Sequence, residues 1–330
     1  MKFDFCIGNP PYQNTVREAS EGNNKNTVDV FPFFQEAALK ISKANCLIYP
    51  AKEYQRGKKN LMDNHLIRLR IYNGSAKEAE KSIPGEDSIF GNIVRRIPGD
   101  VGVFYWDTEK TSNKITYQDM ELDRTKLILP VRKDLIEIAY KLSKFADSFH
   151  FSSITKACES NFVQYNPEDV LGEVKNRNKP APEGYTKVLT NDKAGSGGKA
   201  KWYYIKTTSL DRLQPERYKV ITSSAYPNEA FKNQNNIEII NKDEMFGRSK
   251  LAIYDSDNYD RACSFRKFLS TKFVKLIVMM TPFKFLYYLP NFDLIYDEID
   301  WKANVDNIDN QLYRMCSFSE SEINLVNSLI

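Results

Sequence analysis

Four consecutive residues, Asn9-Pro10-Pro11-Tyr12, combine an amide, two rigid rings and an aromatic side chain directly after an apolar run over residues 3–8. Each proline locks φ and restricts the residue before it, so the run is predicted to end as a strand and the motif to form a rigid extended turn. An amide oxygen and a rigidly held carbonyl are acceptors that could polarise an amine, and a tyrosine ring could stack on a base. A plain turn is the alternative, but the helix and strands expected downstream favour a site.

The motif resembles the catalytic signature of DNA methyltransferases that methylate N6 of adenine. In such enzymes the asparagine oxygen and the carbonyl of the following proline accept hydrogen bonds from the exocyclic amine, whose lone pair is otherwise delocalised into the ring. The resemblance implies that Asn9 and Pro10 are these acceptors and that Tyr12 stacks on an adenine flipped out of the duplex. Pro11 would help to bind the base. Phe104 is a candidate second aromatic there, with ordinary strand core as its alternative.

The resemblance extends beyond the motif to the second half of an Eco57I-type methylase domain. The similar proximal segments are residues 47–52, 57–59, 69–77 and 101–107, and the weaker distal ones are residues 218–220, 300–301, 311–313 and 320–323. This similarity implies double-stranded DNA as substrate, S-adenosylmethionine as methyl donor, and a role in a restriction–modification or defence system.

The donor site of such enzymes has no counterpart where it is expected. A glycine-rich turn and an acidic residue normally precede the Asn-Pro-Pro-Tyr strand, but that strand begins here at residue 3. The only glycine-rich candidate, residues 195–199, lies in a polar, lysine-rich stretch and is interpreted as a flexible loop. We therefore identify no cofactor-binding residue. We expect the strand at residues 3–8 to be an apolar edge strand, a second protein subunit to carry the donor site, and the chain alone to bind the donor weakly.

Alternating apolar runs and helical periodicity predict an α/β sheet for the first part of the chain. Strands are expected at residues 3–8, 46–50, 66–72 and 101–106, and helices at residues 30–42 and 59–65. The resemblance makes this a partial Rossmann-like class I methyltransferase sheet, residues 1–130, followed by a mixed α+β target-recognition domain, residues 131–330. There we expect a helix at 132–145, a long loop region at 166–200, one helix at 258–280 and a capped helix at 319–330.

The charge balance allows a local DNA-binding patch without demanding one. Lys and Arg number 47 against 43 Asp and Glu, a formal net charge of +4. The candidate phosphate contacts, each with a solvated surface as its alternative, are Arg56, Lys58, Lys59, Arg95, Arg96, Arg248 and Lys250. Five dispersed cysteines, only two histidines, no signal peptide and no long apolar run argue against a disulfide framework, a zinc site and a membrane protein, and they predict a cytoplasmic location.

Two other functions remain open from the sequence. The chain could be a non-catalytic DNA-binding specificity subunit that keeps the motif as a base pocket. A nuclease is disfavoured, because the only acidic group of that type, Glu168, Asp169 and Glu173, is too closely spaced for the usual metal-binding strand pair. Methyl transfer itself requires no metal.

Overall fold

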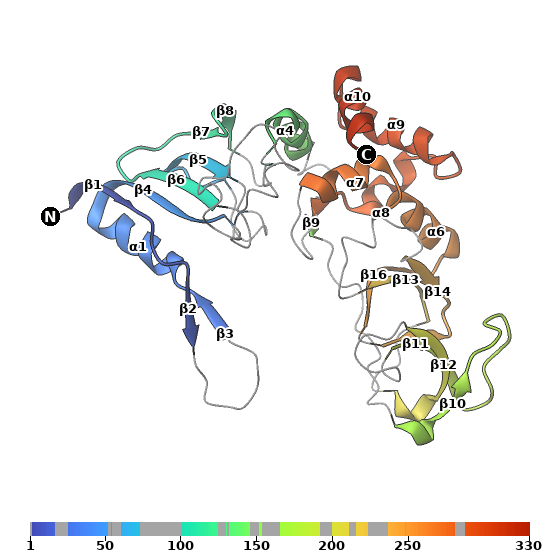
Figure 1. Ribbon diagram of the computed structural model, residues 1–330. Helices are drawn as coiled ribbons and strands as arrows, with labels where there is room; N and C mark the ends of the chain where they lie inside the picture. Colours follow the sequence, from blue (N-terminus) through green and yellow to red (C-terminus); the bar gives the residue numbers. More distant parts are fainter. Residues whose placement is uncertain are drawn as a thin grey trace. The chain divides into compact units, whose positions relative to one another are not determined.

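The computed structural model (Figure 1) divides the chain into two compact units, Met1–Asp147 and Ser148–Ile330, which are described separately. The residues described are 2–16, 26–51, 54, 61–72, 101–124, 130, 132–145, 152–153, 166–191, 200–210, 216–223, 237–247, 249–280 and 288–330. The helix at 136–145, which follows the boundary predicted near residue 130, falls in the first unit. The assignment of the units as catalytic and recognition domains stays a prediction.

The first unit is built on a mixed six-stranded sheet with the order β1-β4-β6-β5-β7-β8. Its strands are β1 (Phe3–Gly8), β4 (Ser42–Pro50), β5 (Leu66–Tyr72), β6 (Val101–Asp107), β7 (Lys114–Tyr117) and β8 (Met120–Asp123). β1 runs parallel to β4, whereas β6 is antiparallel to both β4 and β5. The chain leaves β1, forms the hairpin of β2 (Gln13–Val16) and β3 (Asn26–Asp29), and returns through helix α1 (Phe31–Ile41) to β4. The predicted α/β character is thus confirmed for this unit.

Helix α1 covers one face of this sheet, and side chains on the other face are partly exposed. Asn45, Leu47 and Tyr49 alternate along β4 and are buried, whereas the intervening residues are partly exposed. α1 lies on the covered face, because the ring of Phe31 stacks on Tyr49 with centroids 5.1 Å apart. Phe104 stacks on the other side of Tyr49 at 4.0 Å. These stacked rings tie α1 to the middle of the sheet.

The orientation of α1 differs from what its sequence suggests. The helix is found where the spacing of apolar residues predicts it, but the stripe turned to the sheet contains Phe31, Gln35 and Ala38. Phe33 and Phe34 point away and stay exposed. The more apolar stripe of the helix therefore does not contribute to the core formed by the described residues.

In the described part of the chain, the second unit combines three small sheets with a helical region. Its sheets are β10 (Val170–Glu173), β12 (Lys201–Lys206), β11 (Tyr185–Thr190) and β15 (Glu244–Phe246); β14 (Glu238–Ile240), β13 (Tyr218–Ser223) and β16 (Lys250–Ser256); and β17 (Tyr288–Leu289) with β9 (Ser152–Ser153). Its helices are α6 (Tyr259–Phe268), α7 (Lys272–Met280), α8 (Phe292–Ile295), α9 (Val305–Met315) and α10 (Glu320–Leu329). Helix α4 (Ile136–Phe145) belongs to the first unit, and single 3₁₀ turns lie at Lys133–Leu135, Pro167–Asp169, Thr207–Ser209 and Tyr296–Glu298. This confirms a mixed α+β composition.

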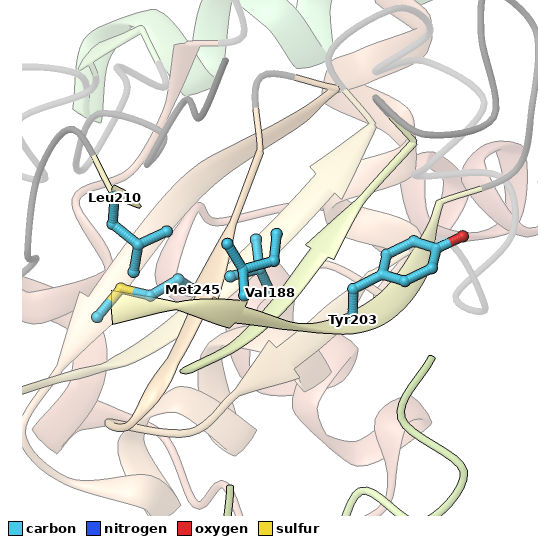
Figure 2. Close-up of a cluster of buried hydrophobic side chains, with 5 residues drawn as sticks. Val188, Tyr203, Leu210 and Met245 are labelled. Carbon is cyan, nitrogen blue, oxygen red and sulfur yellow. The ribbon is translucent and has the colours of Figure 1, made fainter. Parts of the chain in front are cut away.

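A small apolar core holds the sheet of β10, β12, β11 and β15 together. Val188, Tyr203, Leu210 and Met245 gather on one side of it (Figure 2) and are all buried. Beside this core lies a charged group: Glu244 is fully buried and pairs with Arg177. The sheet therefore depends on an internal ion pair as well as on apolar packing.

Three sequence-based expectations for secondary structure were wrong within the described residues. Strands β10 and β11 lie in the stretch 166–200 that was expected to be loop, and residues 61–65 form turns instead of the end of a helix. The single helix expected at 258–280 is interrupted after Phe268, where Ser270 and Thr271 turn their hydroxyls back onto main-chain carbonyls. Within the described part of the chain, no helix is long and apolar enough to cross a membrane.

Candidate functional site

The Asn-Pro-Pro-Tyr segment forms a loop at the carboxyl end of β1. The parallel register pairs Gly8 with Leu47. β4 continues for three more residues beyond this pair, to Pro50, so it extends past the start of the loop. Asn9 is exposed, Pro10 is buried, Pro11 is exposed and Tyr12 is half-buried. The buried proline anchors the loop, and the Asn9 amide stays open to a ligand.

The main chain of Tyr12 is hydrogen-bonded to the residue that precedes α1. Its carbonyl accepts a hydrogen bond of 3.1 Å from the amide of Val30, the residue before the helix. Burial raises the pKa of the Tyr12 hydroxyl above 10.0, and the neighbouring side chain of Asn9 opposes part of this rise. The hydroxyl makes no hydrogen bond of standard geometry with a described residue. The structure therefore brings together Asn9 and Tyr12, the two side chains to which the resemblance gives roles.

Phe104 lies in the core and not on a surface that a base could reach. It is fully buried, with Tyr49 on one face and Tyr54 at 5.1 Å. Its ring also folds over Gly102, where an added Cβ would come within 2.3 Å of it. This placement supports the alternative of ordinary strand core and disfavours a direct contact with a substrate.

The structure places few of the predicted phosphate contacts. Lys250 has its ammonium 3.4 Å from Glu238 Oε1 and a largely buried side chain, so its charge is already neutralised. The other six candidates, which lie outside the described residues, are Arg56, Lys58, Lys59, Arg95, Arg96 and Arg248. Their proposed contacts with DNA stay predictions.

The second unit contains a groove that the sequence did not indicate. It has a volume of about 1380 Å³ and is bordered by α6 and by the segment from η6 (Tyr296–Glu298) to the start of α9. Tyr259, Tyr296 and Trp301 give it aromatic edges, and Arg266 and Lys302 are among its basic residues. Four basic and four acidic side chains line it, so it has no net charge that would track a phosphate backbone. The residues that line the groove come from separate segments of the chain, so no local sequence motif could have predicted it.

Metal ligation finds no support among the described residues. No group of three or more His, Cys, Asp or Glu side chains is placed to hold a metal there. Asp169 is 3.5 Å from Lys206, and Glu173 is 3.1 Å from Lys201, so two members of the acidic group considered for a nuclease form separate ion pairs.

The described residues also do not fit a methyl donor by themselves. S-adenosylmethionine sites of the kind implied by the resemblance need a carboxylate for the ribose and a glycine-rich turn at the ends of parallel strands. The described residues that directly follow the parallel pair β1 and β4 are Asn9 and Ala51, and neither is acidic. Asp119 follows β7, which is parallel to β5, but its carboxylate is paired with Arg68 and Arg70. Residues 195–199 lie outside the described part of the chain.

Part of the first unit matches a known protein family. The model of the Eco57I restriction-modification methylase family matches residues 1–75, a segment that contains β1, the loop from Asn9 to Tyr12, α1, β4 and β5. No curated protein matches the chain. The first unit is therefore similar to restriction-modification methylases, and this similarity includes the candidate site.

Proposed function

We propose that the chain is an adenine-N6-specific DNA methyltransferase, or the catalytic and target-recognising subunit of one, in a restriction–modification or defence system. The observation that carries the proposal is the loop at the end of β1. It presents an open Asn9 amide beside a half-buried Tyr12, within the segment that matches the methylase family.

In this proposal the residues of the loop bind and polarise the target base. Asn9 Oδ1 and the carbonyl of Pro10 accept hydrogen bonds from the exocyclic amine of a flipped adenine, which turns the nitrogen lone pair out of the ring. Tyr12 stacks on the base and offsets part of the cost of unstacking, by about 1–3 kcal/mol. The buried Pro10 keeps its carbonyl at a fixed place. S-adenosylmethionine supplies the electrophilic methyl group, and another polypeptide supplies its site.

Replacement of Asn9 by Ala tests the catalytic role. The native complex that contains the chain should form N6-methyladenine in duplex DNA, measured by mass spectrometry of the nucleosides. Loss of a fixed polar group at the reacting centre typically lowers the rate by about 10²–10³-fold, and we expect a loss in this range for Asn9→Ala. Asn64→Ala, at an exposed asparagine elsewhere in the same unit, is the matched control and should leave the rate unchanged.

A second function is favoured by the lack of a fitting donor site among the described residues. The chain would then bind DNA as a specificity subunit and keep the loop as a base pocket without chemistry. An unchanged methylation rate in the Asn9→Ala complex would support this function and contradict the first. Titration of S-adenosylmethionine into the purified chain by calorimetry should give no saturable heat; clear binding would contradict the assignment of the donor site to another polypeptide.

A further inference from the structure

A strained turn joins β7 to β8 in the first unit. Gln118 and Asp119, the two residues at its centre, both have positive φ angles, 48° and 66°. Asn, Asp and Gly tolerate this left-handed conformation, whereas glutamine adopts it at an energetic cost. Backbone strain of this kind persists only where the surrounding structure fixes it, and it is concentrated at ligand-binding and catalytic sites. The turn is therefore a candidate ligand-binding feature.

Gln118 fixes this turn to β5. Its side chain is buried, the Oε1 atom accepts a hydrogen bond of 2.9 Å from the amide of Ile71, and the Nε2 atom donates one of 2.9 Å to the carbonyl of the same residue. The main-chain amide of Gln118 also donates to the carbonyl of Leu69 at 3.2 Å. These three hydrogen bonds extend the pairing of β7 with β5 and hold Asp119 beside the side chains of β5.

The carboxylate of Asp119 is shared between two arginines of β5. It lies 2.5 Å from Arg68 Nη2 and 2.9 Å from Arg70 Nη1, and the ammonium of Lys133 is 3.9 Å away. Even without Lys133, one carboxylate faces two guanidinium groups, so these residues together keep a positive charge. The other ion pairs between described residues of this unit join one cation to one carboxylate: Lys43 with Asp4, Lys110 with Asp107, Lys114 with Glu121 and Arg132 with Asp134.

The two arginines are accessible and held in place. Their side chains are 54% exposed at Arg68 and 31% exposed at Arg70. They alternate along β5 with the buried Leu69 and Ile71, so they lie on the face of the sheet that α1 does not cover. The guanidinium of Arg70 also lies 4.9 Å from the ring centroid of Tyr72. A guanidinium has five donors in a planar fork that fits the oxygens of a phosphate, and one shared carboxylate leaves most of them available.

The arginines lie at the same end of the strands as the candidate loop. β1, β4 and β5 run in one direction, because β6 is antiparallel to both β4 and β5. The strand register places Arg70, Val103 and Ile48 on one level of the sheet. Gly8 is one level before this, so the loop begins at Asn9 on the level of Arg70. Three strand spacings separate the two residues, a distance of about 14 Å.

We propose that Arg68 and Arg70 bind phosphates of the DNA backbone next to the target base, and that Asp119 positions them. The two backbones of a duplex are about 12 Å apart across the major groove. A duplex that presents a base at Asn9 therefore has backbone phosphates at about the distance of the arginines. Such contacts fix the position of a protein on DNA without reading its sequence. The choice of DNA as the ligand rests on the proposed function, whereas the surplus positive charge does not.

A purely structural ion-pair cluster is the alternative, and Asp119→Asn distinguishes the two roles. Asparagine tolerates the left-handed conformation and keeps an acceptor for the guanidinium groups, but it removes the negative charge. If the arginines bind phosphate, this variant should bind DNA about threefold more tightly at low salt. Asp4→Asn removes the same charge from a one-to-one ion pair, that of Asp4 with Lys43, and should leave the affinity unchanged.

The salt dependence of DNA binding by the full chain is the main test. Fluorescence anisotropy with a labelled duplex would give the affinity over a range of NaCl concentrations. Arg68→Ala combined with Arg70→Ala should reduce the slope of log K against log salt by about 0.9 for each lost phosphate contact, hence by about 1.8. A slope change of about 1.8 means a relative loss of about 60-fold for each tenfold dilution of salt. Lys43→Ala combined with Lys110→Ala removes the same charge at the opposite end of the strands and should change the slope little.

The outcomes separate this proposal from the proposed function. Circular dichroism should confirm that each variant is folded, and Asp119→Asn decides if the double arginine variant is not. An unchanged slope in a folded arginine variant, equal effects of the two double variants, or no tightening by Asp119→Asn would overturn the phosphate site. If the arginine variant loses slope as expected but the native complex forms no N6-methyladenine, the phosphate site stands and the proposed methyl transfer fails.

Discussion

Replacement of Glu244 by Ala should destabilise the second unit more than any exposed ion pair could. The carboxylate is fully buried and accepts hydrogen bonds from Arg177 Nε at 2.7 Å, from Arg177 Nη2 at 2.5 Å and from the amide of Asn241 at 2.7 Å. Its removal leaves the guanidinium and this amide without their partner. Removing one member of a buried ion pair typically costs about 3–5 kcal/mol. Because the Arg177 side chain is 33% exposed and regains some hydration, we expect about 3 kcal/mol, at the low end of that range.

The same pair makes the stability depend on pH. Burial raises the pKa of Glu244, but the hydrogen bonds from Arg177 and from the Asn241 amide outweigh burial, so its pKa lies below the ordinary 4.5. A carboxylate with a lowered pKa in the folded state stabilises the fold above its unfolded pKa, and this contribution is lost as the pH falls through the folded value. The difference in stability between the wild type and Glu244→Gln should therefore be largest near pH 7 and shrink below about pH 4.5.

Urea unfolding followed by tryptophan fluorescence measures both effects. The Arg177 guanidinium lies 4.3 Å from the ring centroid of Trp202, so this tryptophan reports on the region. Glu173→Ala is the matched control, because Glu173 forms an exposed ion pair with Lys201 at 3.1 Å in the same sheet, and such pairs contribute about 0–1 kcal/mol. If Glu244→Ala lost no more stability than Glu173→Ala, or if the loss were independent of pH, the reasoning would be refuted.

Three further substitutions have defined outcomes. Gly102→Ala would place a Cβ 2.3 Å from the Phe104 ring and should cost about 1–3 kcal/mol by overpacking, visible as a lower melting temperature by calorimetry. Ser319→Ala removes the hydroxyl that accepts from the amide of Glu322 in the capping box of α10, and urea unfolding should show a loss of about 1 kcal/mol. Asp309→Ala leaves the amides of Lys272 and Phe273 without their acceptor at the start of α7 and should cost about 2–3 kcal/mol; Asp309→Asn should restore part of it, and an equal loss in both variants would contradict this role.

Local patterns in the sequence predicted many elements because the tertiary structure agrees with them. The apolar runs predicted β5 and β6, and the capping signal at Ser319 predicted the start of α10. Other elements depend on contacts that no local pattern contains. β11 pairs with β12 along its whole length and with β15, two strands from other parts of the chain, and these pairings place strands where composition favoured a loop.

The candidate site was predictable in part. Asn9, Pro10 and Tyr12 lie within four consecutive residues, so the sequence alone requires them to lie close together. The hydrogen bond between Tyr12 and Val30 and the burial of Phe104 depend on how α1 packs on β4. The face of α1 that packs on the sheet was not predictable, because hydrophobic periodicity identifies apolar positions on a helix without identifying what they pack against.

The hydrogen bond from Val30 to Tyr12 has a consequence for how the chain can diverge. It closes the hairpin of β2 and β3 at its base, so the candidate loop and the start of α1 are fixed to each other independently of what lies between Val16 and Asn26. The entropy of closing such an excursion grows only slowly with its length, by about 0.6 kcal/mol for each doubling. Insertions and deletions at the hairpin tip should therefore be tolerated without displacing Asn9.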